Sequence, residues 1–230
     1  MQFFSILMAA VAPGVALLAY FYLKDRYDTE PIHLVMKMFL FGVLIVFPTM
    51  VLQRALVHAT SDDPFSFAFI ISGGLEEFLK WFLLYYIIYR HTSFDEPYDG
   101  IVYAVAVSLG FATLENVIYA FFNYSSFSLL LLRAFLPVSG HAIFGVLMGY
   151  HLGQAKFHKE VETKHLLMSY FVPMFWHGMF DFILIQFPSN WAWLMVPFMI
   201  YLWVRSIKKV NRANSTSPLR LITREDEVKI

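Results

Sequence analysis

The sequence contains no cysteine, which excludes thiol catalysis, disulfide bonds and cysteine metal sites. Charge is also scarce: only 15% of the 230 residues are charged, whereas 59% are hydrophobic. A soluble domain of this length could not cover its surface with so few charges. The composition therefore favours a protein that crosses a membrane several times. The formal net charge is zero, so nothing indicates nucleic-acid binding.

Long apolar runs are abundant, and each one is a candidate membrane span. A transmembrane helix needs about 20 mostly apolar residues. The runs that meet this need are residues 2–23, 34–56, 66–89, 100–123, 128–153, 166–187 and 189–206. Short connections join them, without an internal repeat or a second domain. The first run follows no basic segment and precedes no cleavage site, so we interpret it as a span and not as a signal peptide.

The pattern predicts an all-α bundle of about seven transmembrane helices. The membrane domain is expected to occupy residues 1–210, and residues 211–230 are expected to form a polar, disordered cytoplasmic tail. Among the connections, lysine and arginine occur in alternate ones and in the tail: Lys24, Arg26, Arg90, Lys156, Lys159, Lys164, Arg205, Lys208, Lys209 and Arg212. Arg54 and Arg133 lie just inside predicted spans. The second connection carries Asp62 and Asp63 instead. By the positive-inside rule, the N-terminus lies outside the cell and the C-terminus in the cytoplasm.

Several ionisable side chains lie inside the predicted spans. An ionised group at the bilayer centre costs about 2.5–3.5 kcal/mol on insertion scales, so such residues are functional candidates. They are Glu76, Glu77, Lys80, Glu115, His141, His177 and Asp181. With a helical rise of about 1.5 Å per residue, Glu76 lies ~15 Å and Glu115 ~12 Å below the outer surface. Four predicted spans therefore place carboxylates and imidazoles at one level, in the outer half of the membrane.

Local spacing adds two predicted pairs. Glu76 and Lys80 are four residues apart, so they share a helix face and are expected to pair. His177 and Asp181 have the same spacing. Asp181 is therefore expected to accept a hydrogen bond from one imidazole nitrogen and to direct the other nitrogen into the site.

Each of these residues also has a purely structural interpretation. A buried Glu–Lys pair can join two helices, and a lone histidine such as His141 can be a packing residue. Arg133 is more simply explained as an interfacial side chain that extends toward the headgroups than as a site residue. Glycines in the spans are most simply helix-packing positions: Gly100, Gly110, Gly140, Gly145 and Gly149. The joint occurrence of acids and imidazoles at one depth nevertheless favours a functional site.

The residue types narrow the chemistry. No HExxH or GxSxG motif is present. A pairing of Asp99 with Asp181 is rejected, because the two predicted positions are about a bilayer apart. Glutamate and histidine remain: a glutamate can take a proton from water, and imidazoles can stabilise an oxyanion. That set suits hydrolysis of a peptide bond. The same residues could bind a divalent metal such as zinc, so metal-free and metal-dependent mechanisms both stay open.

Four motifs resemble those of the PrsW family of bacterial intramembrane proteases. They are LEEFLKW at 75–81, FATLEN at 111–116, VSGHAIFG at 138–145 and WHGMFD at 176–181. Residues 12–35 and 94–116 are similar to this family as well, and the resemblance covers roughly residues 10–205. It implies a multi-pass protein of the bacterial plasma membrane. It also implies a fold similar to that of the CAAX-prenyl endopeptidases and the bacteriocin-immunity (Abi) proteins.

The resemblance also implies an activity and a partner. Proteins of this family make the first, site-1 cut in a single-span anti-sigma factor such as RsiW. An extracytoplasmic-function sigma factor is then released during envelope stress, for example from antimicrobial peptides. By position, Glu76 and Glu77 match the catalytic glutamate pair, His141 the third motif, and His177 with Asp181 the fourth. Glu115 stands where the wider superfamily has a histidine, which leaves its role open.

The resulting hypothesis is an intramembrane endopeptidase. Glu76 is the expected general base, and Glu77 is expected to orient the water or share its proton. His141 and His177 bind water, stabilise the oxyanion or ligate a metal, and Glu115 completes the site. Supporting roles are expected for Lys80, Asn116 and Arg133, and the candidate metal ligands are Glu76, Glu77, Glu115, His141 and His177.

Two alternatives belong to other classes of protein. One is a proton- or ion-coupled transporter, in which the same carboxylates form a relay. The cytoplasmic halves of the predicted spans are nearly free of ionisable groups, which argues against a relay that reaches both membrane faces. The other is a non-catalytic membrane scaffold that binds the anti-sigma factor.

Overall fold

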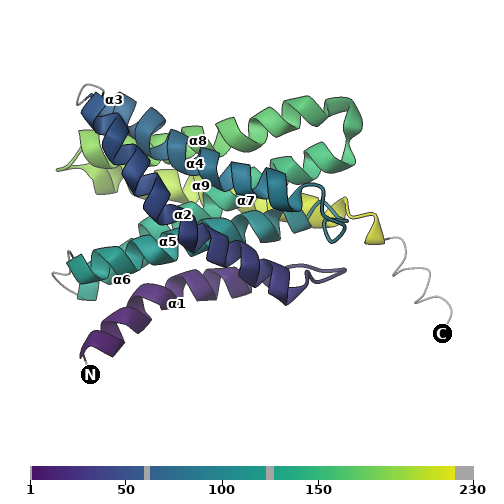
Figure 1. Cartoon of the computed structure of the whole chain (residues 1–230), viewed down its shortest axis with the longest axis horizontal. Helices are drawn as coiled ribbons and strands as arrows, with labels where there is room; N and C mark the ends of the chain where they lie inside the picture. Colours follow the sequence, from purple (N-terminus) through teal and green to yellow (C-terminus); the bar gives the residue numbers. More distant parts are fainter. Residues whose placement is uncertain (1, 60–62, 123–126, 221–230) are drawn as a thin grey trace.

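The computed structural model describes residues 2–59, 63–122 and 127–220 of the chain (Figure 1). Within these residues the chain is helical and contains no strand, which confirms the predicted all-α class. Residues 221–230 of the predicted tail and Asp62 of the second connection lie outside the described residues.

The described elements join into seven long helical stretches. Four of them are single α-helices: α1 (Gln2–Tyr22), α2 (Ile32–Ala59), α5 (Asp99–Phe122) and α9 (Trp191–Ser215). The third stretch consists of α3 (Pro64–Ser66), the π-helix η1 (Phe67–Ser72), α4 (Gly73–Leu83) and the π-helix η2 (Leu84–Ile88). The fifth consists of α6 (Phe127–Arg133), the π-helix η3 (Ala134–Val138) and α7 (Ser139–Phe157). The sixth consists of the 3₁₀-helix η4 (Lys159–Val161) and α8 (Glu162–Gln186).

Five of these stretches are long and apolar enough to cross a membrane, which confirms a multi-pass membrane protein. In the described residues they are Phe4–Tyr22, Ile32–His58, Asp99–Phe122, Leu131–Phe157 and Lys159–Gln186. The predicted spans 66–89 and 189–206 are helical but are not among the five. The first of these is interrupted by two π-helices and carries three ionisable side chains. The second continues to Ser215, into the segment predicted as a disordered tail.

Helix α5 lies at the centre of the bundle and packs against α1, α2 and α7 (Figure 1). In the most apolar part of α5, 78% of the residues are buried, whereas only 17% are buried in the corresponding part of α1, which lies at the periphery. Contact between α5 and α7 is close because glycines face each other: a Cβ atom on Gly100 would lie 2.5 Å from the carbonyl oxygen of Gly149. The packing interpretation therefore holds for both glycines. It does not hold for Gly140, where an added Cβ would meet no atom closer than 3.6 Å.

Candidate functional site

The acids and imidazoles singled out in the sequence converge on one small cavity of about 160 Å³. They come from α4, α5, α7 and α8. The cavity is lined by Ser72, Glu76, Glu115, Arg133, Pro137, His141, Phe144, His177, Phe180, Asp181 and Leu184. Residues that were predicted at one depth on four different spans therefore lie together in the fold.

Two local features bring the helices into this arrangement. Both α4 and α7 are preceded by a π-helix, and π turns recur at functional sites because they rotate the residues that follow. In η3 the cause is visible, since Pro137 has no N–H to continue an α-helical ladder. Helices α4 and α8 also touch at glycines: a Cβ atom on Gly73 would lie 2.8 Å from the amide nitrogen of Gly178.

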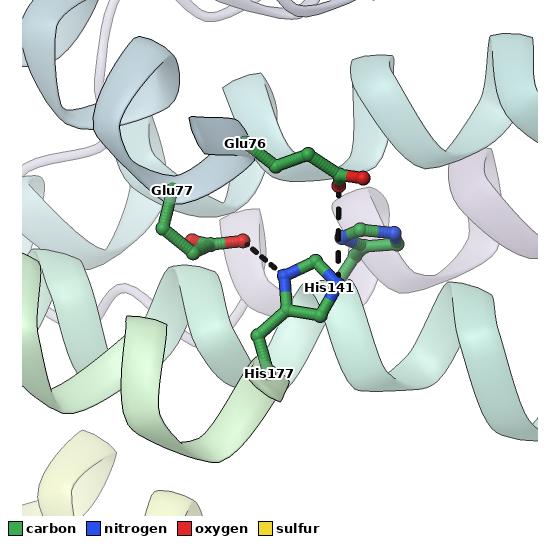
Figure 2. A group of neighbouring side chains, drawn as sticks. All are labelled: Glu76, Glu77, His141 and His177. Atoms are coloured by element: carbon green, nitrogen blue, oxygen red, sulfur yellow. Dashed lines mark hydrogen bonds and ion pairs between the residues drawn. The ribbon is translucent and has the colours of Figure 1, made fainter. Parts of the chain in front are cut away.

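Glu77 orients His177. The ring Nδ1 of His177 donates to Oε1 of Glu77 at 2.9 Å, and both side chains are buried (Figure 2). The expected orienting residue was Asp181, but its Oδ2 lies 3.6 Å from Nε2 of His177 and accepts a hydrogen bond from Ser72 Oγ at 2.6 Å. When the ring is neutral with its proton on Nδ1, Nε2 keeps its lone pair. It lies 3.9 Å from Oε2 of Glu76.

Lys80 is fully buried beside these residues. Its ammonium donates to Oε1 of Glu77 at 2.7 Å and to Nδ1 of His141 at 3.0 Å. The predicted pair with Glu76 is present, but at a longer distance of 3.6 Å. The ammonium also lies 4.4 Å from the centre of the Phe111 ring, within the range of a cation–π contact. The shortest ionic contact of Lys80 is therefore with the second glutamate of the pair.

Glu115 is a hydrogen-bond partner of His141. Nε2 of His141 lies 3.0 Å from Oε2 of Glu115. Since Lys80 donates to Nδ1, the proton of the neutral His141 ring is on Nε2 and is donated to Glu115. Both ring nitrogens of His141 are therefore already used within the protein.

Glu76 faces the cavity with one free oxygen. Its Oε1 accepts a hydrogen bond from Gln53 Nε2 at 3.1 Å, whereas its Oε2 is buried without a hydrogen-bond partner. Sequence reasoning missed Gln53, Ser72 and Phe144. A polar residue inside the predicted span 34–56 was a usable signal for Gln53. Nothing in the sequence signals that the Phe144 ring stacks on His177, with ring centres 4.8 Å apart.

Arg133 lines the cavity, which corrects the expectation that it extends toward the membrane surface. Its Nε donates to Oδ1 of Asn116 at 3.1 Å. Asn116 in turn donates from Nδ2 to the carbonyl oxygen of Ala10 at 2.9 Å. The guanidinium also lies 4.2 Å from the centre of the Tyr119 ring. Arg133 and Asn116 thus form a polar link from the cavity to α1.

The donor set fits a divalent metal of the zinc class. One ligand atom from each of Glu76, Glu77, His141 and His177 lies within 4.8 Å of the others (Figure 2). Carboxylates and imidazoles are common zinc ligands, and a carboxylate on the second nitrogen of a ligand histidine is typical. Oε2 of Glu76 and Oε2 of Glu77 are both buried without a partner. Lys80 donates hydrogen bonds to Glu77 and His141, whereas its contact with Oε2 of Glu76 is a longer ion pair of 3.6 Å. Glu76 and His177 therefore offer the donor atoms that face the cavity.

Fold and site together define a multi-pass helical membrane protein with a buried glutamate–histidine centre. Residues 30–204 match the model of a family described as "PrsW family intramembrane metalloprotease". The chain belongs to this family, and it is a membrane-embedded peptidase.

Known relatives cover nearly the whole chain. The chain is 48% identical over 211 residues to Protease PrsW of Geobacillus kaustophilus, which covers 91% of this chain and 92% of the relative. It is 47% identical over 220 residues to Protease PrsW of Bacillus subtilis, covering 95% and 100% of the two chains. Protease PrsW of Clostridioides difficile is 32% identical over 198 residues, with 82% and 83% covered. No solved structure matches the chain significantly.

Proposed function

We propose that this peptidase makes the site-1 cut, on the extracytoplasmic side, in a single-span anti-sigma factor of the RsiW type. The cut would lead to release of a sigma factor under envelope stress. The observation that carries the proposal is the arrangement of Oε2 of Glu76 and Nε2 of His177. They face each other at 3.9 Å in a buried cavity, and Oε2 of Glu76 has no hydrogen-bond partner there. The basic connections support the predicted orientation, with the N-terminus outside and the C-terminus in the cytoplasm.

Glu76 is the proposed general base. Its free carboxylate oxygen points into the cavity, where it accepts the proton of a water molecule that attacks the scissile carbonyl. Gln53 holds the other oxygen at 3.1 Å, which fixes the direction of the base. The neighbouring Nε2 of His177 has a lone pair, so it can hold the water or receive a proton on the way to the leaving amine.

Glu77 has a positioning role in this mechanism. It was expected to orient the water, but it does not line the cavity and instead accepts hydrogen bonds from His177 and Lys80. These contacts fix the tautomer and the ring direction of His177. Both nitrogens of His141 are likewise engaged, by Lys80 of α4 and Glu115 of α5, so His141 links these two helices and does not donate to an oxyanion.

A zinc-class ion fits the same donors: Glu76 and His177 would hold it, and Oε2 of Glu76 would then be a ligand of the ion in place of the free base. Such an ion supplies Lewis-acid activation of water and of the substrate carbonyl. The contribution of the chain is to orient the donors: Glu77 directs His177, and Gln53 directs Glu76. Lys80 balances the two buried glutamates.

The transporter alternative is less well supported. A relay would need polar groups along the bundle, but the core of α5 between Asp99 and Glu115 is closely packed and mostly apolar. Its fully buried members include Val102, Val105, Ala106 and Leu109. A packed apolar segment of this kind offers no continuous chain of proton carriers.

A cleavage assay with the purified full chain in detergent and a single-span anti-sigma substrate tests the proposal. We expect cleavage by the wild-type protein, loss on treatment with a strong chelator, and recovery with zinc. Glu76→Gln and His177→Ala should be inactive, while the matched change Glu160→Gln, at an exposed position, should be fully active. Undiminished cleavage by Glu76→Gln would refute the assigned base. Undiminished cleavage in the presence of the chelator would refute a requirement for a metal ion. Binding of the substrate without any cleavage would favour the scaffold alternative.

A further inference from the structure

A second group of buried acids lies at the opposite end of α5. We call Asp25, Glu30, Glu96 and Asp99 the loop carboxylates. Asp25 and Glu30 belong to the connection between α1 and α2, Glu96 to the connection before α5, and Asp99 is the first residue of α5. Asp99 and Glu115 are separated by about 24 Å along the helix axis at a rise of ~1.5 Å per residue. The loop carboxylates are therefore separate from the cavity described above.

The group is held in place by the chain around it. One ligand atom from each of Asp25, Glu96 and Asp99 lies within 4.8 Å of the others. Oδ2 of Asp99 accepts hydrogen bonds from the backbone N–H groups of Asp95 and Glu96, both at 2.7 Å. Glu30 accepts a hydrogen bond from the hydroxyl of Tyr103. These contacts position the acids but satisfy only a part of their oxygens.

The remaining oxygens have no partner. Both oxygens of Asp25, both oxygens of Glu96 and Oδ1 of Asp99 are buried without a hydrogen bond. Glu96 is the sharpest case, because its side chain is completely buried and neither oxygen is bonded. No ion pair among the described residues includes any of the three. Unpaired carboxylates in such a position are costly, and paired or metal-bound ones are the rule.

No cationic side chain among the described residues forms an ion pair with the loop carboxylates. Lys156 acts on Asp99 electrostatically, but its ammonium donates to the carbonyl oxygen of His91 at 2.9 Å. The loop carboxylates thus lack a counter-ion in direct contact.

We propose that Asp25, Glu96 and Asp99 bind a hard divalent cation, such as Mg²⁺, Ca²⁺ or Mn²⁺, with Glu30 beside it. The donors are all carboxylate oxygens, which these ions prefer over the mixed nitrogen and oxygen donors typical of zinc. The ion links the two connections to the first turn of α5. Its role is structural, because a bound ion stabilises the fold that forms its site.

Binding of Mn²⁺ tests the proposal directly. The full chain is purified in detergent, stripped with chelator, and titrated with Mn²⁺ under electron paramagnetic resonance. A His177→Ala background removes a donor of the other candidate site. We expect about one Mn²⁺ per chain, displaced by excess Mg²⁺ or Ca²⁺. Glu96→Gln should weaken this binding at least about tenfold, since it removes one of the three charged ligands. Asp28→Asn, an exposed acid in the same connection, should leave it unchanged.

Thermal unfolding gives a second measurement, because it reports how far a bound ion stabilises the fold and not only how tightly a variant binds Mn²⁺. Mg²⁺, Ca²⁺ or Mn²⁺ should raise the midpoint of the stripped wild-type protein and of Asp28→Asn, but not that of Glu96→Gln. The competing explanation is that the loop carboxylates share protons. In that case the wild-type protein binds no Mn²⁺, divalent ions do not shift its midpoint, and in the presence of these ions Glu96→Gln is as stable as the wild type or more so. Any of these results overturns the cation site, whereas loss of peptidase activity has no bearing on it.

Discussion

Replacement of Lys80 by methionine should strongly destabilise the protein. Lys80 and Glu77 are both completely buried, and their charged atoms are 2.7 Å apart. Lys80→Met keeps an unbranched apolar side chain but removes the charge, so Glu77 loses its ionic partner. Removing one member of a buried ion pair typically costs about 3–5 kcal/mol. Glu77 keeps the hydrogen bond from His177, so we expect the lower end, about 3 kcal/mol in the free energy of unfolding.

A double-mutant cycle measures the interaction energy between Lys80 and Glu77. Unfolding of Lys80→Met, Glu77→Gln and the double variant is followed in detergent by the fluorescence of the five tryptophans. Because each single change removes the nearest ionic partner of one buried charge, the double variant should be more stable than the sum of the single effects predicts, by about 0.5–3 kcal/mol. This coupling is absent if the two side chains do not interact.

The chain offers a matched control on the surface. Lys159 and Glu162 have the same spacing of three residues and lie 3.1 Å apart, but both side chains are substantially exposed. Lys159→Met should therefore leave the unfolding transition unchanged, as is usual for surface pairs. If Lys80→Met costs less than about 1 kcal/mol, Lys80 is not the charged partner of a buried glutamate, and the electrostatic account of the site is wrong.

Three further experiments test how helix packing and hydrogen bonds position the site. Gly178→Ala should lower the free energy of unfolding by about 1–3 kcal/mol through overpacking, because a Cβ atom at residue 178 would lie 2.5 Å from Cδ1 of Phe69. The control is Gly140→Ala, whose Cβ atom would meet no close atom and which should leave the free energy of unfolding unchanged. Gln53→Leu should lower kcat by about tenfold with little change in KM, since the loss of one hydrogen bond of ~1–1.5 kcal/mol frees the base to rotate; unchanged kcat would contradict this. Glu115→Gln, which can still accept from His141, should retain more activity than Glu115→Ala when initial rates are compared.

Much of the fold could be predicted from apolar runs, because a membrane span needs a long and nearly uncharged segment. All seven predicted runs are helical in the described residues, and five meet the length and composition of a span. The π-helices η1 and η3 could not be predicted, since a π turn leaves no periodicity of its own in a uniformly apolar stretch. The extension of α9 to Ser215 was missed as well, because its last turn is polar in composition, although Ala213 and Asn214 are buried.

The site was predicted in outline, and both predicted pairs lie within 4 Å, but its shortest contacts were not predicted. Depth along each predicted span was sufficient to bring Glu76, Glu115, His141 and His177 together, since depth depends only on counting residues. Which glutamate meets His177 depends on the rotation of α4, and that rotation follows η1. The i, i+4 rule therefore favoured Asp181 and Glu76, whereas the structure pairs His177 and Lys80 with Glu77.

The central claim is that Glu76 activates a water molecule for direct attack on a peptide bond. A single-turnover reaction of the wild-type protein with a single-span anti-sigma substrate in oxygen-18 water tests it, with mass spectrometry of the new carboxyl terminus. The account predicts a labelled carboxyl terminus for the wild type and no product for Glu76→Gln. An unlabelled terminus would indicate a covalent intermediate on a protein carboxylate, and labelled product from Glu76→Gln would show that another group is the base.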